Sequence, residues 1–241
     1  MVRWMKIGRR RTTALVAVLG LLLGTAAVVS SRGSAWAADA STKYLGVFRE
    51  TSPTEIASGT TSRYGVTPAS VVWFDSWATG NAFNVAAAKA LWSQGVMTHF
   101  TWEPWNTSLG VGDANQIHLQ DIINGEWDSY IKARGAEFAA VGAPVMVRWG
   151  HEFNGNWYVW GGHKNGGAEG GPEKVKKVWR YVVDRFRGVG ATNVLWMWCP
   201  HGPTIDVPVE PWNQISAYWP GEDYVDWYAI DGYNWYPKDP W

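Results

Sequence analysis

Short apolar segments alternate with amphipathic ones along this chain, and the alternation limits the possible folds more than any other feature. Six apolar segments are rich in Val, Ile, Trp, Tyr or Phe; they cover residues 44–48, 71–74, 96–101, 144–149, 194–198 and 225–230. Most of them are typical of strands buried on both faces. Between them, apolar residues repeat at helical spacing in three groups: Phe83, Ala87, Ala90 and Leu91; Trp127, Ile131 and Phe138; and Val175, Val178, Trp179, Val182 and Phe186. This repetition of strand and helix predicts a parallel α/β fold.

The residues that follow the predicted strands favour a barrel over a doubly wound sheet. After the first segment comes Arg49-Glu50-Thr51-Ser52-Pro53, where a dinucleotide-binding fold has a glycine-rich turn. Polar and aromatic groups follow nearly every segment: Asp75 and Trp77; Trp102, Glu103 and Trp105; His151 and Glu152; His201; Asp231, Tyr233 and Trp235. Functional groups at the carboxyl ends of many strands are the signature of a barrel active site. We therefore predict a (β/α)8 TIM barrel that is incomplete, with about six strands present.

The first forty residues predict export. A basic start precedes an apolar stretch over residues 14–29, and Ala35-Trp36-Ala37 is a small-x-small cleavage pattern. A membrane anchor fits less well, because the apolar stretch is short and lies before a good cleavage site. We expect residues 1–40 to be a secretory signal peptide and residues 41–241 a partial barrel domain of a secreted protein. The sequence leaves open whether export uses the general or the twin-arginine route.

Charge and cysteine content narrow the possible partners. The chain has 21 Lys and Arg against 21 Asp and Glu, so it has no net charge that would draw it to nucleic acid or to a membrane surface. Its 19 Trp favour a sugar ligand, because the flat indole is a platform for the apolar face of a ring. The single Cys199 cannot form an internal disulfide and reads as a small buried residue. We expect a monomer that binds a polysaccharide and needs no cofactor.

The stretch from Arg148 to Gly161, RWGHEFNGNWYVWG, contains the strongest candidate for a catalytic carboxyl group. Glu152 follows a predicted strand and is surrounded in sequence by Trp149, Trp157 and Trp160. Desolvation there would raise the pKa of Glu152 and suit it to general-acid attack on a glycosidic bond. A purely structural role, in which Glu152 only caps the segment or pairs with Arg148, remains an alternative.

No zinc motif accompanies this carboxyl group. The position four residues after His151 is Gly155, so the H-E-x-x-H pattern is absent and we expect no metal.

The segment His151-Glu152-Phe153-Asn154-Gly155-Asn156-Trp157, followed by Trp160-Gly161, resembles the acid/base motif of glycoside hydrolase family 26. Other stretches agree in order: Trp102-Glu103-Pro104-Trp105, Asp121-Ile122-Ile123-Asn124-Gly125, Asn193-Val194-Leu195-Trp196, Tyr224-Val225-Asp226-Trp227, and Asp231-Gly232-Tyr233-Asn234-Trp235. The resemblance covers essentially the whole chain after the signal. Known members of that family are mostly endo-β-1,4-mannanases, with some mixed-linkage β-glucanases.

The resemblance implies roles for individual residues. Glu152 would be the proton donor and later the base. The substrate-binding residues would be His151, Trp157, Tyr233, Trp105 and Trp160. The supporting residues around them would be Arg148, Asp231 and Glu103. From the residue chemistry alone, Trp157 and Tyr233 could equally be packing residues, and Asp231 and Glu103 could serve only as structural hydrogen-bond partners.

The chain departs from the family at the nucleophile. A retaining glycosidase needs a second carboxylate about 5–5.5 Å from the first, and in this family it is a glutamate at the end of the seventh strand. Here the only acidic residue after Asp231 is Asp239, in a predicted loop. We expect an amino-terminal fragment of a secreted, endo-acting retaining hydrolase of β-1,4-mannan that has no nucleophile and no activity of its own. The alternatives are a mixed-linkage β-1,3-1,4-glucanase and a non-catalytic carbohydrate-binding protein.

Overall fold

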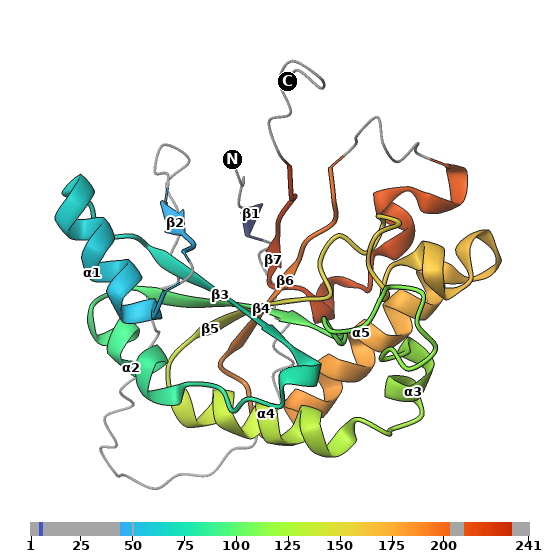
Figure 1. The fold of residues 1–241 in the computed structure, drawn as a ribbon, viewed down its shortest axis with the longest axis horizontal. Helices are drawn as coiled ribbons and strands as arrows, with labels where there is room; N and C mark the ends of the chain where they lie inside the picture. Colours follow the sequence, from blue (N-terminus) through green and yellow to red (C-terminus); the bar gives the residue numbers. More distant parts are fainter. Residues whose placement is uncertain (1–4, 7–43, 50, 203–209, 233–241) are drawn as a thin grey trace, which may run out of the picture.

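The protein is described by a computed structural model over residues 5–6, 44–49, 51–202 and 210–232. Most of the predicted signal peptide lies outside these residues, as do Tyr233, Trp235 and Asp239. Six parallel strands pair in chain order: β2 (Gly46–Val47), β3 (Ser70–Ser76), β4 (Met97–Glu103), β5 (Val145–Trp149), β6 (Val194–Trp198) and β7 (Trp227–Tyr228). The short β1 (Met5–Lys6) pairs with β7 in the antiparallel direction. The six strands form a curled half-barrel (Figure 1), which confirms the predicted incomplete (β/α)8 fold.

Five α-helices connect the strands: α1 (Pro53–Tyr64), α2 (Val85–Ser93), α3 (Leu119–Ile123), α4 (Asp128–Val141) and α5 (Gly171–Gly188). The three helices predicted from apolar spacing are confirmed as α2, α4 and α5. The other two, α1 and α3, did not follow from that spacing. Six short 3-10 turns complete the described part: Trp77–Thr79, Gly162–Asn165, Gly167–Glu169, Pro211–Asn213, Ile215–Tyr218 and Glu222–Tyr224. None of the described helices combines the length and apolarity that crossing a membrane requires.

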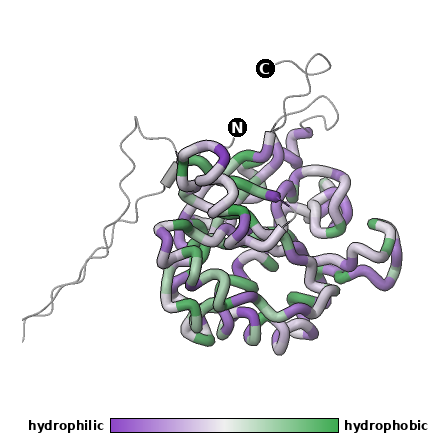
Figure 2. The backbone as a smooth tube through the Cα atoms, turned by 60° about the vertical axis from the view of Figure 1, so that its left-hand side comes forward, coloured by the Kyte–Doolittle hydropathy of each residue, from purple (hydrophilic) through white to green (hydrophobic). Residues whose placement is uncertain are grey.

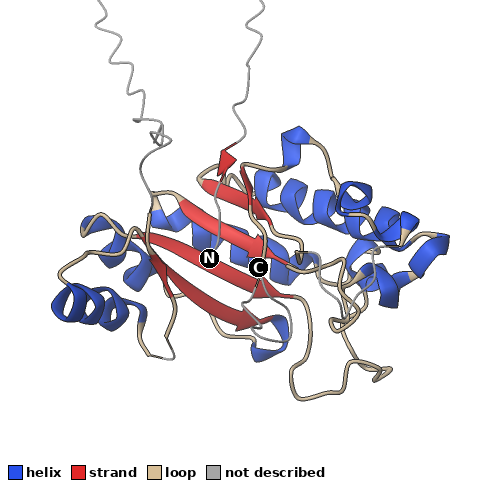
Figure 3. Cartoon of the chain, turned by 90° about the horizontal axis from the view of Figure 1, so that it is seen from above, coloured by secondary structure: helices blue, strands red, loops and turns tan. Residues whose placement is uncertain are grey.

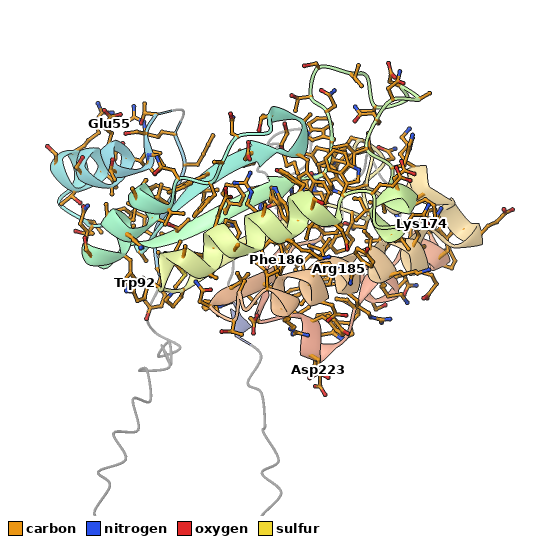
Figure 4. All side chains as sticks on the ribbon, turned by 90° about the horizontal axis from the view of Figure 1, so that it is seen from below. Glu55, Trp92, Lys174, Arg185, Phe186 and Asp223 are labelled. Carbon is orange, nitrogen blue, oxygen red and sulfur yellow. The ribbon has the colours of Figure 1, made fainter. Side chains whose placement is uncertain are left out.

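The helices cover one face of the sheet with their apolar sides. Helices α2, α4 and α5 lie beneath the strands in Figure 1, and hydrophobic and hydrophilic positions alternate along the helical coils in Figure 2. In α5, Phe186 is buried against the sheet, whereas the neighbouring Arg185 binds Asp128 of α4 at 2.8 Å; both are labelled in Figure 4, which shows the helical side. This amphipathic arrangement places the main core between sheet and helices.

Alternate residues of each strand face opposite sides of the sheet, and this alternation decides which ones reach the site. In β5, Val147 and Trp149 join the core under the helices, whereas Met146 packs on the other face with Met197 of β6 and with Cys199. No described helix crosses that second, concave face when the sheet is seen from above (Figure 3). Side chains with the parity of Met146 therefore line the interior of the half-barrel.

Candidate active site

A sharp backbone turn at the end of β5 positions Glu152. Gly150 has φ 49° and Glu152 has φ 54°, and no other non-glycine residue in the described ranges has a positive φ. A left-handed conformation costs a non-glycine residue about 1–3 kcal/mol and persists only where neighbours enforce it. The neighbours here are the two flanking strands: Gly150 N–H donates to the carbonyl of Trp102 at 3.1 Å, and Glu152 N–H donates to that of Cys199 at 2.8 Å. The turn is therefore anchored on β4 and on the end of β6.

Each carboxyl oxygen of Glu152 has its own neighbour. The indole N–H of Trp157 donates to Oε2 at 2.8 Å, and Nδ1 of His201 lies 3.4 Å from Oε1. The Trp157 ring reaches this position by lying against Gly155, where an added Cβ would be 2.5 Å from the ring. Glu152 is buried, with 7% of its surface exposed. The carboxyl group is thus held in one direction.

These contacts reverse the pKa shift that the sequence predicts for Glu152. Burial raises the pKa of Glu152, but the adjacent His201 imidazole, the hydrogen bond from Trp157 and the positive charge of Arg148 outweigh it, so the pKa lies below its usual value. The prediction of a raised pKa is therefore wrong for this chain. It counted the apolar surroundings and left out the donors.

Arg148 lies on the interior side of the half-barrel and contacts both β4 and the segment after β7. Its guanidinium donates to the hydroxyl of Thr101 at 3.1 Å and to the carboxylate of Asp231 at 2.5 Å, and it lies over the ring of Phe74. Burial raises the pKa of Asp231, and the charge of Arg148 opposes that shift. Arg148 pairs with Asp231 and not with Glu152, so the alternative of a simple Glu152–Arg148 pair is wrong. The buried pair ties β4, β5 and the segment after β7 together beneath Glu152.

Glu103 and His151 form a second group beside Glu152. Nε2 of His151 lies 4.0 Å from Oε1 of Glu103, and the indole of Trp105 donates to Oε2 of Glu103 at 3.3 Å. Burial lowers the pKa of His151 well below its usual value, with a further contribution from the charge of Arg148. Burial also raises the pKa of Glu103. His151 is therefore a neutral imidazole at the floor of the site.

The tryptophan rings predicted to contact the sugar differ in how much of their surface is exposed. Trp105 and Trp157 are half-buried and border the site. Trp160 is 1% exposed, stacks on Tyr158 and donates its indole N–H to the carbonyl of His151. Trp160 therefore supports His151 from behind and offers no free ring face, contrary to its predicted role as a sugar contact. Tyr233 lies outside the described residues.

Strand-end position alone did not identify the site residues. Asp75 pairs with Arg134 of α4, and Trp77 and Trp102 are buried among rings on the helical side. The parity of Asp75 along β3 and of Trp102 along β4 turns them away from the concave face, and Trp77 lies in the 3-10 turn after β3. The glycine-rich stretch 161–171 forms two 3-10 turns, with Gly162 and Gly171 in close backbone contact.

Two residues near Glu152 were given no role by the sequence reasoning. His201 contacts the carboxyl group, and Asn154 holds His201 through its side-chain amide. The alternation along β6 could have identified His201, because it shares the parity of Met197 and Cys199, which face the interior.

A metal ion fits this group of residues poorly. Ligand atoms of His151, Glu152 and Asp231 lie within 4.8 Å of one another. However, the Asp231 carboxylate is taken by Arg148, whose positive charge opposes a cation.

Comparison with known proteins decides the family. The model of glycosyl hydrolase family 26 matches residues 73–240. The chain belongs to glycosyl hydrolase family 26. Endoglucanase H of Acetivibrio thermocellus is 32% identical over 171 residues, which are 70% of this chain and 17% of that protein. The β-1,3-xylanase TXYA of a Vibrio species is 28% identical over 130 residues, 52% of this chain and 24% of that protein.

Solved structures of the family share the fold. An endo-β-1,4-mannanase of Cellulomonas fimi, a double mutant, has a TM-score of 0.59 at 19% identity, covering 79% of this chain and 48% of that one. A mannanase of Bacillus subtilis has a TM-score of 0.55 at 18% identity, covering 76% and 61%. The chain thus spans a minor part of Endoglucanase H and TXYA, and less than two thirds of each of these mannanase chains.

Proposed function

We propose that this chain supplies the acid/base half of a retaining glycoside hydrolase site that acts on a β-linked polysaccharide. The observation that carries the proposal is the strained turn at Glu152, whose carboxyl group is aimed by Trp157 and His201 over a buried Arg148–Asp231 pair. Strain at a residue enforced by its neighbours is typical of functional sites.

In the proposed reaction, protonated Glu152 donates its proton to the glycosidic oxygen as the bond to the anomeric carbon breaks. The resulting carboxylate then removes a proton from the water that hydrolyses the glycosyl-enzyme intermediate. The lowered pKa of Glu152 favours the second of these forms in the free chain. A nucleophile carboxylate brought near Glu152 would raise that pKa by like-charge repulsion and favour the acid.

The nucleophile is assigned to a residue outside the described part of the protein. Asp231 is the nearest alternative, but its carboxylate is engaged by Arg148 and burial raises its pKa. Glu103 is engaged by Trp105, and burial raises its pKa as well. Neither is free to attack the anomeric carbon. We therefore propose that residues 1–241 alone do not hydrolyse polysaccharide.

The family resemblance ranks β-1,4-mannan first among substrates. Glucan is the second candidate, because Endoglucanase H is 32% identical to this chain. We also propose that the protein is secreted by means of residues 1–40, on the strength of the basic start, apolar stretch and cleavage pattern.

The test assays the 241-residue chain and the protein extended along its reading frame. We expect the extended protein to release reducing ends from mannan, and Glu152→Gln to reduce kcat/KM by about 10²–10⁴-fold. Activity on barley glucan with none on mannan would reverse the substrate order. Polysaccharide binding without hydrolysis by the extended protein would support the carbohydrate-binding alternative. Turnover by the 241-residue chain that Asp231→Asn abolishes would show that Asp231 is the nucleophile.

A further inference from the structure

The imidazole of His201 lies beside the carboxyl group of Glu152, and the proposed reaction gives it no role. Its Nδ1 is 3.4 Å from Oε1 of Glu152, and His201 is 9% exposed. The buried Nδ1 has no hydrogen-bond partner of normal geometry among the described residues, so the Glu152 carboxyl group is the contact recorded for it. A buried polar atom without a partner is costly, which favours a bond between the two.

The backbone of His201 is fixed by Asn154, which follows Glu152 by two positions. His201 N–H donates to the side-chain oxygen of Asn154 at 2.8 Å, and the amide nitrogen of Asn154 donates to the carbonyl of His201 at 2.9 Å. The rings of Trp157 and His201 pack in a T-shaped arrangement, with their centroids 4.8 Å apart. His201 is therefore oriented by the same loop that carries Glu152.

Several other charged or titratable groups face Glu152; their ion-pair partners lie elsewhere, although the Asp231 carboxyl group also interacts with that of Glu152. They are Arg148 and His151 from the end of β5, Glu103 from the end of β4, and Asp231 from the segment after β7. Arg148 binds Asp231, and His151 is nearest to Glu103. Trp157 donates to Oε2, whereas Oε1 is the oxygen that lies next to Nδ1 of His201.

We propose that His201 is a positioning residue for Glu152: its Nδ1–H donates to Oε1, fixes the direction of the carboxyl group and stabilises its ionised form. The proposal rests on the proposed function of Glu152. In the first half-reaction the proton of Glu152 passes to the leaving oxygen, and the carboxylate left behind accepts from Nδ1–H. The hydrogen bond strengthens as charge develops, so His201 assists the step without losing its own proton.

The experiment follows the titration of Glu152 in the full 241-residue chain. Glutamate is labelled with ¹³C at the side-chain carboxyl, and Glu152→Gln identifies the resonance. We compare His201→Phe, which keeps a ring but has no donor, with His201→Asn, whose amide nitrogen takes the place of Nδ1. His118→Phe is the matched control, because His118 is exposed and not among the groups that face Glu152.

We expect the titration midpoint of Glu152 to move to higher pH in His201→Phe and to remain near the original value in His201→Asn and His118→Phe. An unchanged midpoint in His201→Phe, or an equal shift in His201→Phe and His201→Asn, would overturn the proposal. If His201→Phe does not fold, His201→Gln replaces it, because the glutamine amide lies one bond beyond the position of Nδ1. The same upward shift of the Glu152 midpoint is expected, and its absence would overturn the proposal.

This titration needs neither substrate nor nucleophile, so it separates the two proposals. A midpoint that depends on His201 in a protein whose extended form does not hydrolyse polysaccharide would overturn the catalytic role. If the extended protein hydrolyses polysaccharide and the Glu152 midpoint does not change when His201 is replaced, only the positioning role is overturned.

Discussion

Replacing Gly155 with Ala tests how the loop aims Glu152. A Cβ at this position would lie 2.5, 2.6 and 2.7 Å from three ring carbons of Trp157. Carbon atoms pack at about 3.5–4.0 Å, so the indole has to move by about 1 Å. That movement lengthens the 2.8 Å bond from Trp157 to Glu152 beyond hydrogen-bonding range.

The cost follows from the two interactions that change. A hydrogen bond to a charged group contributes about 1.5–3 kcal/mol, and overpacking costs about 1–3 kcal/mol. Trp157 is half-buried and can swing outward, which relieves most of the overpacking. We therefore expect the free energy of unfolding to fall by about 2 kcal/mol, or about 4–8 °C in Tm for a chain of this size. The pKa of Glu152 should rise, because one of its donors is lost.

Thermal unfolding followed by tryptophan fluorescence measures the first effect, and the carboxyl titration of Glu152 measures the second. Gly59→Ala is the matched control: Gly59 lies inside α1, an added Cβ meets nothing within 4 Å, and alanine should stabilise the helix by about 0.5–1 kcal/mol. Wild-type stability and an unchanged Glu152 titration in Gly155→Ala would refute the link between Gly155, Trp157 and the carboxyl group.

Three further predictions concern the framework of the site. Arg148→Leu should lower the free energy of unfolding by about 3–5 kcal/mol, because it leaves buried Asp231 unpaired. In urea titrations, the Arg148→Leu, Asp231→Asn double variant should lose less free energy of unfolding than the two single variants together. Additive losses would contradict the pairing. Burial raises the pKa of Asp128, but hydrogen bonds from Tyr181, Lys132 and Arg185 outweigh it and lower that pKa from 3.8 to about 2. The ionised carboxylate therefore stabilises the fold at pH values above its unfolded pKa, and this contribution is lost as the pH falls toward 2. The Tm difference between wild type and Asp128→Asn should therefore narrow below pH 4, and a constant difference would count against it. Gly135→Ala places a Cβ 2.7 Å from Val189 and should lower the free energy of unfolding by about 1–3 kcal/mol in the same melts. An unchanged Tm would show that the packing between α4 and the end of α5 adjusts to the added methyl group.

Strands β4, β5 and β6 were predictable because nearly all of their consecutive residues are buried, whereas β2 and β3 are partly exposed. In β5, Val145 to Trp149 are all buried, so the apolar run and the strand coincide. Helix α1 was missed for the opposite reason: only Ile56, Ala57 and Thr60 are buried in it, and three residues do not make a recognisable stripe. Its start was nevertheless marked, because Ser52 precedes Pro53 and its N–H donates to Glu55.

The sequence predicted the position of the candidate site, but it did not predict the direction of the Glu152 pKa shift. The end of β5 located Glu152, and the motif around it named its neighbours. The direction of its pKa shift depends on donors that lie five and forty-nine positions further along the chain, Trp157 and His201. Apolar surroundings alone predict the opposite sign, because desolvation is the only effect that composition reports.

The acid/base half of the site is organised by residues close to it in the described chain. Backbone bonds from Gly150 and Glu152 reach the two flanking strands, and Trp157 and His201 each take one carboxyl oxygen. Phe74 of β3 borders this group, because Arg148 lies over its ring and His151 is near it, and Phe48 and Phe74 contact each other while remaining 50% and 44% exposed. The contacts of Glu152 itself come from Trp157, His201 and the backbone of Cys199, and neither ring is among them. The direction of the Glu152 carboxyl group is therefore set by β5, its loop and the end of β6, and the titration of that group can be measured in the 241-residue chain.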